Sequence, residues 1–226
     1  MKEKNNTVSA RILSIQVGMP ARRGNSDAED AMEREWYSGF IKEPVTGPVR
    51  LGLLNLEGDG QADLTHHGGV DKSVLAYPSS HYPLWERELE LPGIPFGGFG
   101  ENFTVEGLEE DNVCIGDTFS IGDAVVQVSQ PRQPCWKISR RWKIPDLTAR
   151  VMKTGRTGWY FRVLKEGTVE AGQPLRLIER SFPEWTVARA MRVMVERKHR
   201  LPEAAELAEC AALSPGWRAK LAAARS

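Results

Sequence analysis

Cys135 is the residue with the clearest chemical potential, and it lies in the segment Gln130-Pro131-Arg132-Gln133-Pro134-Cys135-Trp136-Lys137. Each proline fixes its own φ at about −65° and pushes the residue before it towards extended geometry, so the sulfur is expected at a defined position. The neighbouring Arg132 and Lys137 favour the thiolate, which is the form that acts as nucleophile or metal ligand. The alternative is a small buried hydrophobic residue without a chemical role.

The surroundings of Cys135 are strongly basic. One acidic residue, Asp146, stands between residues 132 and 156 against eight basic ones, which are Arg132, Lys137, Arg140, Arg141, Lys143, Arg150, Lys153 and Arg156. This local excess of positive charge predicts an anionic ligand, such as a phosphate-bearing small molecule. The whole chain has 30 basic and 30 acidic residues and no RNA-binding signature, so a nucleic-acid partner is not expected, although two tryptophans interrupt the basic run.

Two glycine-containing segments could approach such a ligand. The first, Thr65-His66-His67-Gly68-Gly69-Val70-Asp71-Lys72, offers two histidines and a lysine that could contact phosphate or orient a substrate. The alternative is a tight loop with solvated histidines, and their spacing does not fit a zinc finger. The second, Gly97-Gly98-Phe99-Gly100-Glu101-Asn102, lacks the third glycine of a dinucleotide fingerprint, so a Rossmann fold is not expected. It either brings Asn102 near a ligand or forms a plain turn.

The elements that must position these residues are mainly strands. The predicted strands are Ser9 to Val17, Val45 to Leu56, Phe103 to Val105, Val113 to Ile115, Thr118 to Ile121, Ala124 to Val128, Trp159 to Leu164 and Leu175 to Ile178, with the last two as a pair. Gly-Asp and Gly-Leu turns between the central strands favour a meander or barrel. Helices are expected over His81 to Leu91 and Ile144 to Met152, and a loop over Gly18 to Ala31.

The composition changes after Arg180. Capping-box spacing at Ser181-Phe182-Pro183-Glu184 is followed by three short helical patterns, at Val187 to Arg197, Pro202 to Ala211 and Pro215 to Ala224, with Ser214 as an N-cap. Short helices need a partner to be stable. The sequence therefore predicts a β-rich domain over residues 1–180 and a helical domain over residues 181–226.

Cysteine usage and the chain start predict the compartment. Cys114, Cys135 and Cys210 are odd in number and far apart, which favours a reducing environment over a disulfide framework, and the first and last of them are interpreted as packing residues. No apolar run is long enough to span a bilayer, and the chain start lacks a signal core. We expect a cytoplasmic protein without a membrane partner.

Taken together, four motifs resemble the MOSC domain, named for the C-terminal part of molybdenum cofactor sulfurases, and in particular the bacterial YiiM type of 6-N-hydroxylaminopurine resistance proteins. The motifs are His67-Gly68-Gly69-Val70-Asp71-Lys72, Gly100-Glu101-Asn102-Phe103-Thr104, Cys114-Ile115-Gly116-Asp117 and Gln130 to Cys135. The resemblance extends from about Val8 through Arg180, and the tail resembles that subgroup's three-helix appendage. One difference is the segment Ala21 to Glu35, which is more charged than the corresponding loop of the family.

The resemblance implies a closed, strongly bent β-barrel, mainly β with some α, followed by the three-helix appendage. It also implies a pterin-based molybdenum cofactor whose metal is coordinated by Cys135, a soft ligand suited to such a metal. The residues expected to hold the cofactor or line its mouth are Lys42, His66, His67, Lys72, Asn102, Arg132 and Arg156. The implied activity is reduction of small N-hydroxylated bases and related compounds to amines.

Partners and alternatives follow from the same residues. Three scattered cysteines and the lack of a flavin motif leave the chain without an electron donor of its own, so a separate reductase is expected. A competing function is a sulfur carrier or molybdenum cofactor carrier that uses a Cys135 persulfide. A third is an interaction module formed by the helical tail, whose apolar helices also predict a homodimer.

Overall fold

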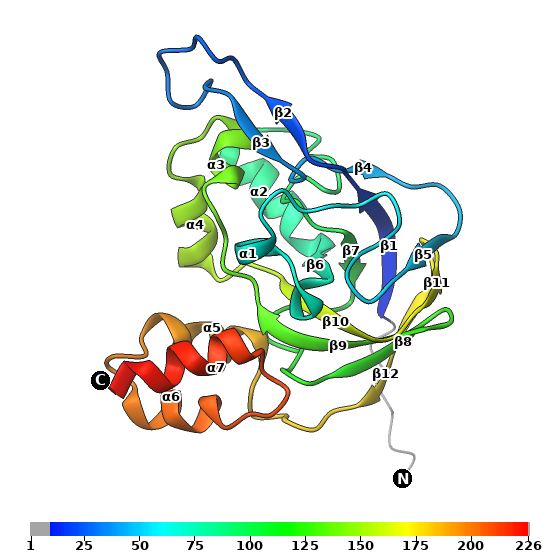
Figure 1. The fold of residues 1–226 in the computed structure, drawn as a ribbon, viewed down its shortest axis with the longest axis vertical. Coiled ribbons are helices and arrows are strands. Elements are labelled where there is room, and N and C mark those ends of the chain that lie inside the picture. Colours follow the sequence, from blue (N-terminus) through cyan, green and yellow to red (C-terminus); the bar gives the residue numbers. More distant parts are fainter. Residues whose placement is uncertain (1–9, 226) are drawn as a thin grey trace.

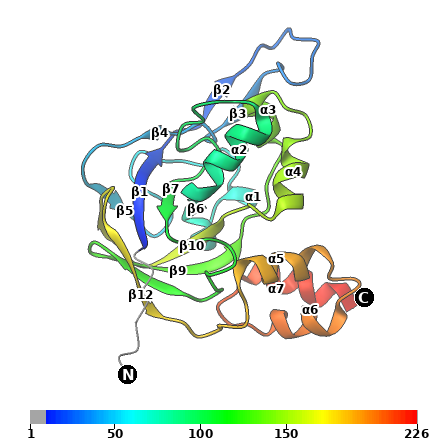
Figure 2. The same ribbon diagram turned by 180° about the vertical axis from the view of Figure 1, so that it is seen from behind.

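Seven strands close into a barrel in the computed structural model, which describes residues 10–225 (Figures 1 and 2). The hydrogen-bonded order is β12-β8-β9-β10-β6-β7-β1, and β1 pairs again with β12, so the sheet closes on itself. The strands are β1 (Ala10–Val17), β6 (Val74–Pro78), β7 (Phe103–Glu106), β8 (Thr118–Ile121), β9 (Ala124–Pro131), β10 (Trp159–Lys165) and β12 (Pro174–Glu179). Neighbours are antiparallel except β6 and β7, which are parallel. The predicted closed barrel is confirmed.

Alternation of side chains explains why these segments form a barrel. In β9 the apolar residues Ala124, Val126 and Val128 are almost completely buried and the residues between them are partly exposed, as expected for a strand with one face on the core. Register shifts interrupt the ladders between Ile12 and Ser14 and between Tyr160 and Phe161. Such irregularities bend a strand, which a small closed barrel requires.

A helical layer covers one end of the barrel. It contains α2 (Tyr82–Leu89), α3 (Lys137–Trp142) and α4 (Leu147–Thr154), and Figures 1 and 2 show the three side by side. Their apolar faces form a second hydrophobic cluster around Tyr77, Trp85 and Phe99. The short α1 (Leu64–His67) and the 3-10 turns η1 (Val70–Lys72) and η2 (Ser79–His81) lead into and out of β6.

A projecting arm and two small pairings complete this part of the chain. The arm is the segment from residue 21 to residue 38, in which β2 (Ala21–Arg23) pairs with β3 (Trp36–Ser38). It extends from the barrel next to α3 (Figures 1 and 2). Elsewhere β4 (Glu43–Pro44) extends the sheet beside β1, and β5 (Val49–Leu51) pairs with β11 (Gly167–Val169).

The tail forms three helices, as predicted. They are α5 (Val187–Val195), α6 (Leu201–Ala208) and α7 (Pro215–Ala222), followed by the turn η3 (Ala223–Arg225). The Ser214 hydroxyl accepts a hydrogen bond from the backbone N of Trp217, which confirms the predicted N-cap. Because residues of α5 to α7 share one hydrophobic cluster with the barrel interior, the division at residue 180 stays a prediction. No helix among residues 10–225 is long and apolar enough to cross a membrane.

Some local predictions are wrong for tertiary reasons. The segment Val113 to Ile115 joins no ladder, because its backbone bonds to the chain around Thr186 instead. The strands β10 and β12 do not pair with each other, since β8 and β9 lie between them. The cap of α5 is Thr186 rather than Ser181, and its hydroxyl accepts a bond from the backbone N of Arg189.

Other predicted boundaries also shift. The expected loop over Gly18 to Ala31 contains β2, and the expected strand over Val45 to Leu56 reduces to β5. The helices α1 and α3 were not predicted. The first residue of the predicted strand Ser9 to Val17 lies outside the described residues, and the rest forms β1.

Candidate functional site

Cys135 lies between the end of β9 and the start of α3. Its side chain is partly exposed, whereas Cys114 and Cys210 are buried. The backbone carbonyl of Cys135 accepts hydrogen bonds from the backbone N of Ile138 at 3.2 Å and from Thr148 Oγ1 at 3.1 Å. These bonds tie the backbone of Cys135 to α3 and α4. Burial raises the pKa of Cys114 and Cys210, which fits their interpretation as packing residues.

A pocket opens beside Cys135. Its wall combines the loop after β3, the turn before α1, the end of the glycine-rich loop (residues 97–102) and the segment after β9. Four of its residues are basic or imidazole side chains, namely Lys42, His67, Arg132 and Lys137. The pocket therefore suits an anion next to the sulfur.

Arg132 is the most constrained of these groups. It is 3% exposed, its backbone N donates to Gly158 O at 3.0 Å, and its Nη2 donates to Phe99 O at 2.7 Å. Its Nη1 is buried and has no hydrogen-bond partner in the described part of the chain. A buried guanidinium donor without an acceptor costs free energy, about 1–3 kcal/mol, until a ligand supplies one. An anionic ligand oxygen in the pocket would satisfy this atom.

Lys42 is the second buried cation of the pocket. Its side chain is 7% exposed and its Nζ donates to Asp59 Oδ1. Burial lowers the pKa of Lys42 below its ordinary value, while the carboxylate of Asp59 acts in the opposite direction. Asp59 also accepts hydrogen bonds from Gly18 N at 2.8 Å and from Asn102 Nδ2 at 2.9 Å. Asp59 thus holds Lys42 in place while it accepts two other hydrogen bonds, and Lys42 adds a second basic group to the pocket wall.

Asn102 lines the pocket but has a structural task. It is 4% exposed, its Oδ1 accepts from Leu75 N at 3.1 Å, and its Nδ2 donates to Gln16 O at 3.2 Å as well as to Asp59. Its amide is therefore fully engaged with the chain. Asn102 ties the glycine-rich loop to β6 and β1 and so shapes the pocket wall.

The glycine-rich loop is held by the carboxylate that ends it. Glu101 is completely buried and accepts hydrogen bonds from Gly97 N at 2.7 Å and Phe99 N at 3.1 Å. Gly100 has φ of +80°, and a Cβ there would lie 2.6 Å from the ring of Phe40. Only glycine fits this turn, which places Phe99 O against Arg132.

A second, larger pocket adjoins the first. It lies between the barrel mouth and the start of α7, which contributes Gly216, Trp217 and Lys220. The two pockets share four residues, which are His67, Gln133, Cys135 and Tyr160. Cys135 therefore stands at the wall common to both.

The histidine-containing segment borders both pockets. His67 lines both, whereas His66 and Lys72 line only the second. Burial, followed by the charge of Lys137, lowers the pKa of His67 to about 4, so its imidazole is neutral at pH 7. Burial and the nearby Lys220 lower the pKa of Lys72. His66 is exposed and its Nδ1 lies 2.8 Å from Asp63 Oδ2.

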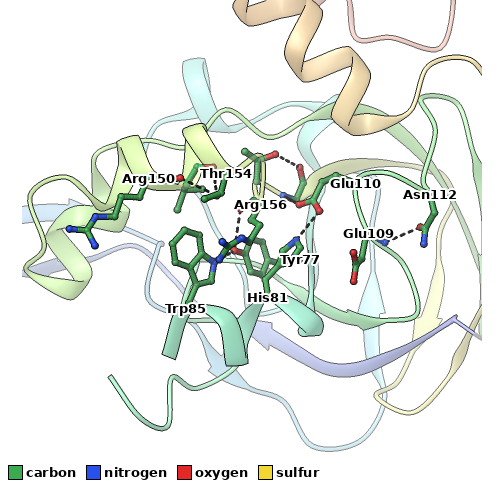
Figure 3. Close-up of polar contacts among 12 residues, drawn as sticks. Tyr77, His81, Trp85, Glu109, Glu110, Asn112, Arg150, Thr154 and Arg156 are labelled. Atoms are coloured by element: carbon green, nitrogen blue, oxygen red, sulfur yellow. Dashed lines mark hydrogen bonds and ion pairs between the residues drawn. The ribbon is translucent and has the colours of Figure 1, made fainter. Parts of the chain in front are cut away.

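Arg156 is the one predicted site residue that the structure does not bring to either pocket. Its Nη2 pairs with Glu88 Oε1 at 2.7 Å, and its guanidinium lies 4.3 Å from the centroid of the Trp85 ring. Figure 3 shows it beside Trp85 and Tyr77, in the helical layer. Arg156 follows Gly155, the left-handed cap that ends α4.

Several lining residues were not predicted. Lys220 and Gly216 come from the tail, and Tyr160 comes from β10, so nothing in the local sequence connects them to Cys135. Lys137 was recognised as a neighbouring cation and not as a pocket residue. Its place immediately after Cys135 and Trp136 was the available signal.

The chain is similar to proteins of one known family over nearly its whole length. Residues 63–176 match the family described as "MOSC domain", and residues 185–223 match the one described as "YiiM-like, 3-alpha helix domain". The uncharacterized protein YflK of Bacillus subtilis is 47% identical over 92% of this chain and 91% of that protein. Protein YiiM of Escherichia coli is 39% identical over 80% of this chain and 81% of its own length.

The structural comparison agrees with the sequence comparison. The crystal structure of YiiM from Geobacillus stearothermophilus has a TM-score of 0.79 and 36% identity, and the match covers 96% of this chain and 100% of that one. A protein named "Reductase" from Gibberella moniliformis is 38% identical over 81% of this chain but over 32% of its own length. Most of that fungal protein therefore lies outside the match.

Proposed function

The chain belongs to the MOSC-domain proteins of the YiiM type, and from this premise we propose that it binds a molybdenum cofactor and reduces N-hydroxylated bases and related compounds to amines. The coarser part of this proposal, an enzyme that binds a molybdenum cofactor, is supported by the family match and by the relative named "Reductase". The finer part, the N-hydroxylated substrate, rests on the resemblance of the four sequence motifs to the 6-N-hydroxylaminopurine resistance proteins.

The observation that carries the proposal is the buried Nη1 of Arg132, which finds no acceptor among residues 10–225 and lies in a pocket shared with a partly exposed cysteine. A pterin cofactor bears a negative charge, and charge-assisted hydrogen bonds to a guanidinium are among the strongest that a protein makes. Lys42 and Lys137 add positive charge in the same pocket. The donor set therefore fits an anionic cofactor.

Cys135 would hold the metal through its thiolate, because soft sulfur ligands suit such metals. When bound, the cofactor would supply the two-electron redox chemistry, and the protein would supply binding, orientation and electrostatics. His67 is neutral at pH 7, so it would act through hydrogen bonds rather than as a third positive charge. His66 and Lys72 would contact what occupies the second pocket.

The overall reaction fixes what must be supplied from outside. Reduction of R–NHOH to R–NH₂ breaks the N–O bond and consumes two electrons and two protons, and the oxygen leaves as water. Three dispersed cysteines cannot hold a conventional iron–sulfur cluster, so we propose a separate reductase as electron donor. A homodimer and a cytoplasmic location are proposed on the sequence alone.

The test uses protein expressed in a host that makes the cofactor. We expect bound molybdenum and reduction of 6-N-hydroxylaminopurine with reduced benzyl viologen as artificial electron donor. Cys135→Ser should lose molybdenum and activity, because a hydroxyl is a poor replacement for the thiolate. Cys210→Ala, which changes a buried packing residue, is the matched control and should keep both. Full molybdenum content in Cys135→Ser would refute the ligand role.

The same protein separates the proposal from the carrier function. Cys135 is accessible from two pockets, so it could also bear sulfur as a persulfide. Mass spectrometry after incubation with a cysteine desulfurase and cysteine would detect this group. A stoichiometric persulfide on Cys135 together with the absence of viologen-linked reduction would favour the carrier and overturn the reductase.

A further inference from the structure

Trp136 is a large apolar side chain that remains half-exposed next to Cys135. Its exposed fraction is 51%, and it lines the second pocket. An indole left in solvent beside a chemical group offers a flat apolar face to a ligand.

Two neighbouring side chains contact this indole and hold its orientation. The ring of Trp36 meets it edge-on, with centroids 5.9 Å apart and an interplanar angle of 63°. The guanidinium of Arg140 lies 5.0 Å from its centroid, in cation–π contact. Trp136 is thus exposed without being free to reorient.

The arm provides this support. Arg140 Nη1 donates to Arg34 O at 2.5 Å, and Lys143 Nζ pairs with Glu33 Oε1 at 2.5 Å. These contacts dock the charged segment from residue 21 to residue 35 onto α3 and its C-cap Lys143. Through Arg140 and Trp36, the arm therefore contacts the side chain that lines the second pocket.

The two pockets differ in chemistry on either side of Cys135. Both contain cations, Lys42 and Arg132 in the first and Lys72 and Lys220 in the second, but the half-exposed indole of Trp136 belongs to the second alone. If an anionic cofactor fills the first pocket, a second molecule can approach Cys135 from the second pocket, because Cys135 lines both.

We propose that the second pocket binds the substrate and that Trp136 is the stacking platform for its planar ring. This inference rests on the proposed function, and it assigns recognition of the planar ring of the substrate to Trp136. Every nucleobase has a π face, so stacking discriminates by planarity.

The test compares a planar and a non-planar substrate on the molybdenum-loaded enzyme. For 6-N-hydroxylaminopurine, Trp136→Ala should raise KM roughly 5- to 150-fold, the range that loss of one base–aromatic stack produces, with a smaller change in kcat. For hydroxylamine, KM should stay within about twofold, since this molecule makes no stack. Trp136→Phe keeps a flat ring and should restore most of the affinity for the purine.

A second readout does not depend on turnover. The wild-type protein should bind adenine, the amine product, in isothermal titration calorimetry, and Trp136→Ala should weaken this binding by a similar factor. Leu177→Ala is the matched control, because Leu177 is an exposed apolar residue of β12, at 46%, that lies outside both pockets and outside the arm. It should change neither readout.

The outcomes separate this inference from the proposed function. An inactive wild type whose adenine binding depends on Trp136 would overturn the reductase and leave the stacking platform standing. An active wild type in which Trp136→Ala shifts KM for both substrates equally, or for neither, would overturn the stacking platform alone.

Discussion

Replacement of Arg132 by methionine should abolish most anion binding at the first pocket while leaving the fold intact. The substitution keeps an unbranched apolar stem and removes the guanidinium. It breaks the bond from Nη2 to Phe99 O, and it also removes the buried Nη1, which has no partner in the part of the chain that the structure describes. These two effects are opposite in sign and of similar size, so the unliganded protein should change in stability by less than about 2 kcal/mol.

The magnitude for binding follows from the charge-assisted hydrogen bond that Nη1 would make to a ligand oxygen. Such bonds contribute about 1.5–3 kcal/mol, so inorganic phosphate should bind roughly 10- to 150-fold more weakly to Arg132→Met. At a phosphate concentration of about 100 times the wild-type Kd, ligand stabilisation is about 2.7 kcal/mol for the wild type and falls to about 0.3–1.4 kcal/mol for the variant.

The assay is thermal unfolding of the cofactor-free protein with and without phosphate. For a chain of this length, about 1 kcal/mol corresponds to about 2–4 °C, so the phosphate-induced rise in Tm should be about 3–10 °C smaller in the variant. Arg156→Met is the matched control, because Arg156 pairs with Glu88 outside both pockets. Its phosphate-induced rise should equal that of the wild type.

Two results would refute this reasoning. A wild-type phosphate response in Arg132→Met would mean that Nη1 is not the anion-binding atom of the pocket. Loss of the response in Arg156→Met would mean that the anion binds beside Arg156, in the helical layer.

Two further predictions concern the groups around the pocket. His67 should titrate with a pKa of about 4 in an NMR pH series of the folded protein. Because the imidazole binds a proton more readily in the unfolded chain, the contribution of neutral His67 to folding stability is present above pH 6.5 and is lost as the pH falls towards 4. A midpoint near 6.5 in the folded protein would contradict this prediction. Ser214→Ala should lower the free energy of unfolding in urea by about 1–2 kcal/mol, because the Ser214 hydroxyl caps α7 and also donates to Gln130 Oε1 at 2.7 Å. Ser181→Ala is the control and should change the free energy of unfolding little, because the Ser181 hydroxyl bonds to Glu179 and caps no helix.

The sequence alone determined much of the chemistry near Cys135. The two prolines, Arg132 and Lys137 are adjacent in the chain, and local backbone restrictions indicate that such a segment presents its cysteine in a defined way. The strands around the central turns were also predictable, because alternation and Gly-Asp signals are local properties. The closed barrel came from resemblance to a family rather than from these patterns.

Only the tertiary structure decided which cations face the sulfur. Arg156 lies in the basic run, yet it turns to Glu88 and Trp85, whereas Lys42 and Lys220 come from distant segments. The physical reason is that the direction of a long charged side chain depends on the acids and aromatic rings that reach it. Barrel closure and the docking of α7 determine those neighbours, and neither is encoded within the local sequence.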